Sequence, residues 1–147
     1  MARRALLPLL CLALSGTAAP ARAQELSPRA SYILHCSGCH GMTGGGATAA
    51  GIPDFSGSVG HIATLDLGRT YIMHVPGVVS ASLSDAEIAE VMNYVLDAWG
   101  DGRGAPFTPE EVTRRRAAPV EDVVAFRRSV AEEMGRRGLP IAEYPWP

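Results

Sequence analysis

Residues 35–43 read "HCSGCHGMT", and this stretch decides how the chain is interpreted. Cys36 and Cys39 are separated by two residues, and His40 follows the second cysteine directly. This spacing places two thiols and an imidazole within about two turns of helix. Short motifs of this kind also occur by chance, so the rest of the chain must decide what the motif does.

The surroundings of the motif favour one of three chemistries. A zinc site uses four ligands, usually as two close pairs, but no second cysteine pair follows, and His61 and His74 are thirteen residues apart. A redox dithiol lies at a helix start in a βαβ unit, whereas this motif ends a predicted helix in a chain without strand patterns. A haem anchor explains the spacing, because two thiols add across the haem vinyl groups and the adjacent histidine then reaches the iron.

The N-terminus has the pattern of an export signal. Arg3-Arg4 is followed by an apolar run over 5–14 and by an A-x-A cleavage site at 21–23. We therefore expect residues 1–23 to be a cleaved signal peptide, with a periplasmic mature protein that begins at Gln24. The apolar run is shorter than the roughly 20 residues that a membrane span needs, and no later segment approaches that length, so no membrane span is predicted.

The charge is unevenly distributed. Three of the 13 basic residues fall in the predicted signal peptide, which leaves ten arginines against 15 acids. Residues 24–100 hold seven acids and two arginines, whereas the tail from Asp101 holds eight of each. This balance argues against nucleic acid as a partner.

Capping signals outline an all-α chain. Ser27-Pro28 predicts a helix that runs to Cys36, and glycines recur from 38 to 60 in what must be a loop. A helix over 66–74 is stopped by Pro76-Gly77. The strongest helix starts with a capping box at 84–87, has a buried apolar face, and ends at Gly100.

The tail predicts further short helices. After a linker over 101–106, Thr108-Pro109 caps one helix, and Pro119 is expected to open another whose Arg127 lies on its polar face. Residues 143–147 are expected to be extended, as a strap or a loose end. The arginines of the tail are expected either to pair with its glutamates or to dock a partner enzyme.

Residues Pro28 to Gly100 resemble the class I c-type cytochromes. In that family an aromatic residue four positions before the first cysteine packs against one on the last core helix, and Tyr32 and Tyr94 occupy these places. A proline about a dozen residues after the haem histidine accepts its Nδ1 proton through the carbonyl, which implies this role for Pro53. The segments "GRTYIMHVPGV" and "LSDAEIAEVMNYVL" resemble a subgroup of small bacterial monohaem cytochromes.

The resemblance implies a fold and a cofactor. We expect an all-α, cytochrome c-like domain over 24–100 around one haem c bound through Cys36 and Cys39, with His40 as an iron ligand. Residues 101–147 form a linker and a C-terminal helical extension.

The sixth iron ligand stays open. The family supplies a methionine from the loop before the last core helix, but residues 76–83 contain none. Met73 fits the family habit, whereas helical periodicity places His74 on the inward stripe and Met73 beside the polar residues of the helix. An open position and Met92 are the remaining alternatives. We expect other roles, in the loop or at the surface, for Met42, His35 and His61.

These features predict an electron-transfer protein rather than an enzyme. A soluble haem protein of this size is expected to shuttle single electrons between a donor dehydrogenase, or another redox enzyme, and a respiratory acceptor. Two alternatives remain: a five-coordinate haem protein that binds a gas or peroxide, and a fixed cytochrome subunit of a dehydrogenase complex.

Overall fold

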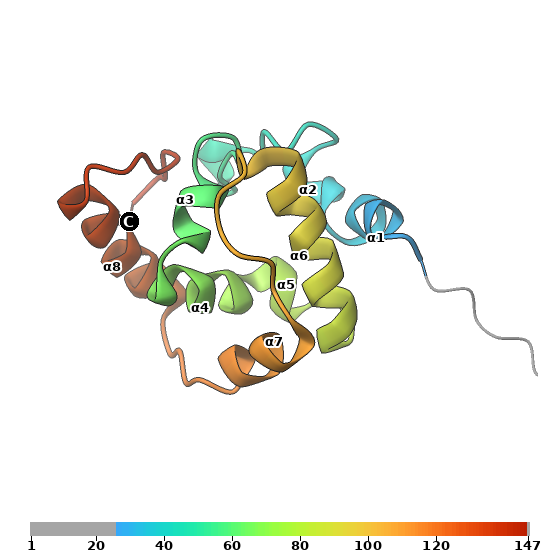
Figure 1. Ribbon diagram of the computed structural model, residues 1–147. Coiled ribbons are helices and arrows are strands. Elements are labelled where there is room, and N and C mark those ends of the chain that lie inside the picture. Colours follow the sequence, from blue (N-terminus) through green and yellow to red (C-terminus); the bar gives the residue numbers. More distant parts are fainter. Residues whose placement is uncertain (1–25, 147) are drawn as a thin grey trace, which may run out of the picture.

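The computed structural model describes residues 26–146, so the predicted signal peptide over 1–23 lies outside the described residues. The described part is helical, which confirms the predicted all-α class, and its one β-bridge joins Ala47 to Ile52. Within residues 26–146, no helix is both long and apolar enough to cross a membrane. The helices, shown in Figure 1, are α1 (Pro28–His35), α2 (Ser37–His40), a 3-10 turn (Thr48–Ala50), α3 (Val59–Ala63), α4 (Asp66–His74), α5 (Pro76–Val79), α6 (Asp85–Trp99), α7 (Pro109–Arg116) and α8 (Val123–Arg136).

Helix α6 is the central element. Its capping box is complete: the Ser84 side chain accepts from the Glu87 backbone N–H, and the Glu87 carboxylate accepts from the Ser84 backbone N–H. The predicted apolar face is buried in the core, apart from a half-buried Trp99 at its end. Helix α1 packs against α6, with the rings of Tyr32 and Tyr94 5.6 Å apart, as the resemblance implied.

The glycine-rich segment between α2 and α3 is an ordered loop. Gly46 donates its backbone N–H to the carbonyl of His40 at 3.0 Å, and the Tyr32 hydroxyl donates to the carbonyl of Gly41 at 2.6 Å. Gly44 has a φ of +74°, and a Cβ there would lie 2.7 Å from the Trp99 ring. The loop therefore folds closely over the end of the cysteine-histidine motif.

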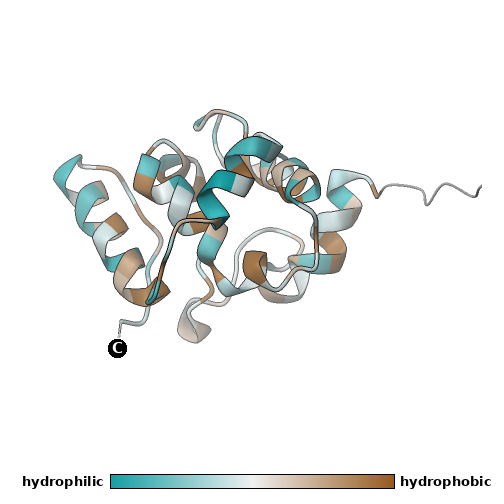
Figure 2. Ribbon diagram, turned by 90° about the horizontal axis from the view of Figure 1, so that it is seen from below, coloured by the Kyte–Doolittle hydropathy of each residue, from teal (hydrophilic) through white to brown (hydrophobic). Residues whose placement is uncertain are grey.

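The C-terminal extension packs against the body of the protein. Helix α7 contacts α4 and α6, and α8 contacts α3 and α4, as Figure 1 shows. Figure 2 shows hydrophobic residues on the side of α8 that faces the other helices, and Val130 and Met134 are fully buried there. The core thus continues from the first hundred residues into the extension.

Two expectations for α8 are wrong. The helix begins at Val123 rather than at Pro119, because the Asp122 side chain caps it by accepting from two backbone N–H groups of its first turn. Arg127 is only 1% exposed, instead of lying on a solvated face. Its guanidinium is buried because it donates to the Ala142 carbonyl, at 3.0 Å, and also to the hydroxyl of a tyrosine on α4.

Candidate functional site

The two cysteines and the histidine of the opening motif lie on consecutive turns. Cys36 ends α1, and α2 then carries Ser37 to His40, whose backbone N–H donates to the Cys36 carbonyl at 3.0 Å. Both cysteines are free thiols; Cys39 is exposed and Cys36 is half-buried. Burial raises the pKa of the Cys36 thiol, and the neighbouring Cys39 adds to this effect. The chain thus presents two reduced thiols and an imidazole from one short helical segment.

His40 lies in an aromatic environment with one unsatisfied ring nitrogen. Its ring stacks on Phe55, with the centroids 4.0 Å apart and the planes inclined by 17°. Burial lowers the pKa of His40, and an interaction with the backbone of Pro53 opposes that change. Nδ1 is buried and lacks a hydrogen bond of normal geometry. Such a nitrogen, next to a carbonyl, suits an imidazole whose other nitrogen binds a metal, because the carbonyl then fixes the tautomer.

A glycine lets Pro53 come close to the motif. Gly46 has a φ of +66°, and a Cβ there would lie 2.5 Å from the carbonyl oxygen of Pro53. The loop can therefore pass directly over this carbonyl only because residue 46 has no side chain. The structure places the backbone of Pro53 beside the ring of His40.

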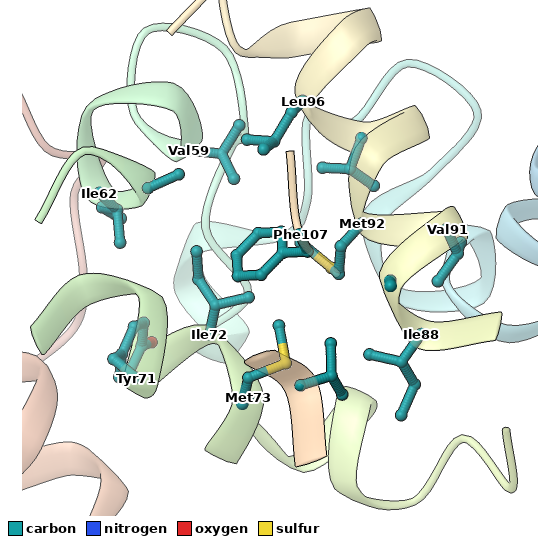
Figure 3. Packing of buried hydrophobic residues seen from close by; sticks show 14 of the residues in the cluster. Val59, Ile62, Tyr71, Ile72, Met73, Ile88, Val91, Met92, Leu96 and Phe107 are labelled. Carbon is teal, nitrogen blue, oxygen red and sulfur yellow. The ribbon is translucent and has the colours of Figure 1, made fainter. Parts of the chain in front are cut away.

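Met73 lies in the hydrophobic core. Its side chain is 0% exposed, and its end points toward the part of the core that holds Phe107 and Met92 (Figure 3). The outward orientation that periodicity predicted for Met73 is wrong. Helix α7 covers that side of α4, so the residues there are not exposed to solvent as a lone amphipathic helix would leave them.

The ring of His74 is turned toward the C-terminal extension. Its Nδ1 lies 2.8 Å from the Thr70 carbonyl oxygen and its Nε2 lies 2.9 Å from the Ala118 carbonyl oxygen. A neutral imidazole carries one N–H, so one of these two nitrogens donates to its carbonyl and the other keeps its lone pair. Met92 lies in the same part of the core as Met73 and is 6% exposed, whereas Met42 is 57% exposed and His35 is exposed.

The donor set fits a covalently attached haem better than a zinc ion. Among residues 26–146, no group of three or more histidine, cysteine, aspartate or glutamate side chains is placed to hold a metal ion. Two cysteines that form no disulfide, followed by an imidazole whose Nδ1 lies near the Pro53 carbonyl, are instead what haem attachment requires. These residues would supply two thioether links and one iron ligand.

Comparisons with known proteins agree with this donor set. The chain is 34% identical over 125 residues to cytochrome c-552 of Thermus thermophilus, covering 69% of this chain and 95% of the relative. A second cytochrome c-552, from a designated strain of the same species, is also 34% identical, and the match covers 84% of that relative. No family model and no solved structure matches. The chain therefore belongs to the c-type cytochromes, a family of electron-transfer proteins that carry haem c.

The sequence reasoning missed two aromatic residues beside His40 and one in the core. Phe55 stacks on His40, Trp99 follows at 5.6 Å from Phe55, and Phe107 enters the core from the extension. Both Phe55 and Trp99 could have been identified from the sequence. Phe55 is an aromatic residue inside the glycine-rich segment, and Trp99 ends the apolar face of α6. Phe107 directly follows the predicted linker, and no local pattern marks it as buried.

Proposed function

We propose that the protein is a periplasmic monohaem cytochrome that shuttles single electrons between a donor dehydrogenase, or another redox enzyme, and a respiratory acceptor. The supporting observation is His40, which follows two free thiols and has a buried Nδ1 that no side chain satisfies. Cys36 and Cys39 bind the haem covalently, and His40 is one axial ligand. When bound, the haem supplies an iron that accepts and releases one electron.

Met73 is the second axial ligand in this proposal. It lies on α4, in the part of the chain that precedes α6, and a thioether is a suitable ligand for haem iron. The neighbouring His74, the alternative ligand, has its ring turned toward the extension, with its two nitrogens near the carbonyls of Thr70 and Ala118. A sulfur ligand raises the reduction potential relative to two imidazoles, so the choice decides which partners the carrier can serve.

The remaining parts of the site tune and protect the haem. The Pro53 carbonyl orients the His40 ring, and the stacked Phe55 and the following Trp99 exclude water from that side. The acidic balance of residues 24–100 attracts basic partner surfaces, and this attraction weakens as salt is raised. Export through the signal over 1–23 places the protein where such partners work.

Absorption spectra of the purified mature protein test the proposal. We expect covalent haem c bands, a weak sulfur-to-iron band at the red end in the oxidised form, and no rapid change with carbon monoxide. A protein without covalent haem would refute the proposal entirely. A rapid response to carbon monoxide would instead support the gas-binding or peroxide-binding alternative, and co-purification with a dehydrogenase would support the subunit alternative.

A further inference from the structure

The C-terminal strap, residues 139–146, runs from the end of α8 back to the glycine-rich loop and has no regular secondary structure. It is held at Ala142 on both sides of the backbone. The Ala142 N–H donates to the Ser58 hydroxyl at 3.0 Å, and the Ala142 carbonyl accepts from Arg127 at 3.0 Å. Both partner residues are buried, so these two bonds fix the strap to the body of the protein.

Arg127 is a buried cation whose hydrogen-bond partners, among residues 26–146, are neutral. It donates to the Tyr71 hydroxyl at 3.2 Å and to the Ala142 carbonyl, and its Nε is buried without a partner in that range. A buried charge that has lost its hydration needs another source of electrostatic stabilisation. The ring of Tyr144 provides one, because the guanidinium carbon lies 4.6 Å from its centroid. Arg127 thus holds both the backbone of the strap and the Tyr144 ring.

The ring of Tyr144 also packs on the turn that precedes Pro53. Gly51 ends the 3-10 turn with a φ of +74°, and a Cβ there would lie 3.5 Å from the Cε2 and from the hydroxyl oxygen of Tyr144. Thr48 and Ala49 of the same turn line a shallow hollow together with residues of the strap. The strap therefore contacts this turn directly.

Backbone contacts join the turn to His40. Ala47 and Ile52 form the β-bridge, in which the Ala47 N–H donates at 2.8 Å and the Ile52 N–H donates at 3.2 Å. Pro53 follows the bridge directly, and its backbone lies beside the His40 ring. Gly46 precedes the bridge and donates its N–H to the His40 carbonyl at 3.0 Å. A displacement of the turn would therefore move the Pro53 carbonyl relative to the ring.

We propose that Tyr144 is a positioning residue: held by Arg127, it clamps the turn over 48–51 and keeps the Pro53 carbonyl in place for the Nδ1–H of His40. The consequence for the haem rests on the proposed function, because it takes His40 as an iron ligand. A hydrogen bond from Nδ1–H makes the imidazole a stronger donor, which favours ferric iron and lowers the reduction potential. Loosening the turn should weaken this bond and raise the potential.

Amide hydrogen exchange of the holoprotein tests the clamp. We expect Tyr144→Ala to speed exchange at Ala47 and Ile52 by about tenfold or more, while amides in the middle of α6 stay as slow as in the wild type. Tyr144→Phe should restore slow exchange, because it keeps the ring. Phe126→Ala is the matched control: it removes an aromatic ring of the extension that packs on Tyr71, with the centroids 6.3 Å apart, and should leave exchange in the loop unchanged.

The reduction potential tests the route from the clamp to the iron. It should rise in Tyr144→Ala and return to the wild-type value in Tyr144→Phe, a pattern that a general loss of stability does not produce. A fall in the potential, or no change despite faster exchange in the loop, overturns the role given to Pro53.

The remaining outcomes separate the clamp from the proposed function. Unchanged exchange in the loop of Tyr144→Ala, or equally faster exchange throughout α6, overturns the clamp. A purified protein without covalent haem refutes the proposed function, whereas its loop exchange still tests the clamp. If Tyr144→Ala does not fold, Ser58→Ala replaces it, since it removes only the hydroxyl that accepts from the Ala142 N–H, and unchanged loop exchange in that variant overturns the inference.

Discussion

Replacing Glu111 with glutamine tests the ion-pair network that joins the extension to α4. The Glu111 carboxylate accepts from Arg69 and Arg115, is 15% exposed, and has its pKa lowered from 4.5 to about 2, chiefly by the hydrogen bond from Arg69. At about 1.4 kcal/mol per pKa unit, the folded state gains up to about 3 kcal/mol from the ionised form. We expect Glu111→Gln to lower the free energy of unfolding at pH 7 by about 2 to 3 kcal/mol.

The pH dependence distinguishes this mechanism from a simple packing defect. Because the folded pKa is depressed, the stabilisation is fully present above the unfolded pKa of 4.5 and is lost as the pH falls through about 2. Denaturant unfolding of both holoproteins between pH 7 and pH 2 should therefore show a stability difference that closes below about pH 4.5. The neighbouring Glu110→Gln, an exposed residue in the same helical turn, is the control. A difference that does not change with pH would refute the reasoning.

Two further changes test the haem anchor and the loop over it. The Cys36→Ser, Cys39→Ser variant should lose covalent haem, which a haem stain of a denaturing gel detects; retained stain would contradict the proposed attachment. Gly44→Ala should lower the free energy of unfolding by about 1 to 3 kcal/mol, because the added methyl group overlaps the Trp99 ring and φ is positive. Thermal unfolding measures this change, and Gly77→Ala, with nothing within 4 Å of the added atom, should leave the midpoint nearly unchanged.

The helix starts that were predicted correctly are those set by local chemistry. The Ser27 and Thr108 side chains accept backbone N–H groups of the turns that they open, and proline follows each at the first helical position. Pro119 failed as a helix start, because Ala118 before it has no side-chain acceptor, whereas the Asp122 carboxylate three residues further on accepts two backbone N–H groups. Local rules therefore predict the start of a helix well where only one nearby side chain can accept the first backbone N–H groups.

Side-chain orientation could not be predicted where distant segments cover a helix. The polar residues of α4 suggested a solvated face, but Arg69 is 8% exposed because its guanidinium donates to Glu111 and to backbone carbonyls of α3 and of the extension. Arg127 is buried for the same reason, with the Ala142 carbonyl as a partner. Hydrophobic periodicity identifies one buried face of a helix, whereas α4 is covered on two sides, by α7 and by α8.

The two halves of the proposed iron site therefore differ in how far the sequence determines them. Cys36, Cys39 and His40 lie on one segment, so their spacing alone brings them together. The proposed second ligand lies on α4, which forms bonds with residues about 40 positions later, such as Glu111 and Ala118. Met73 and His74 are adjacent in sequence but point in different directions, so the choice between them depends on tertiary packing and cannot be predicted from local sequence.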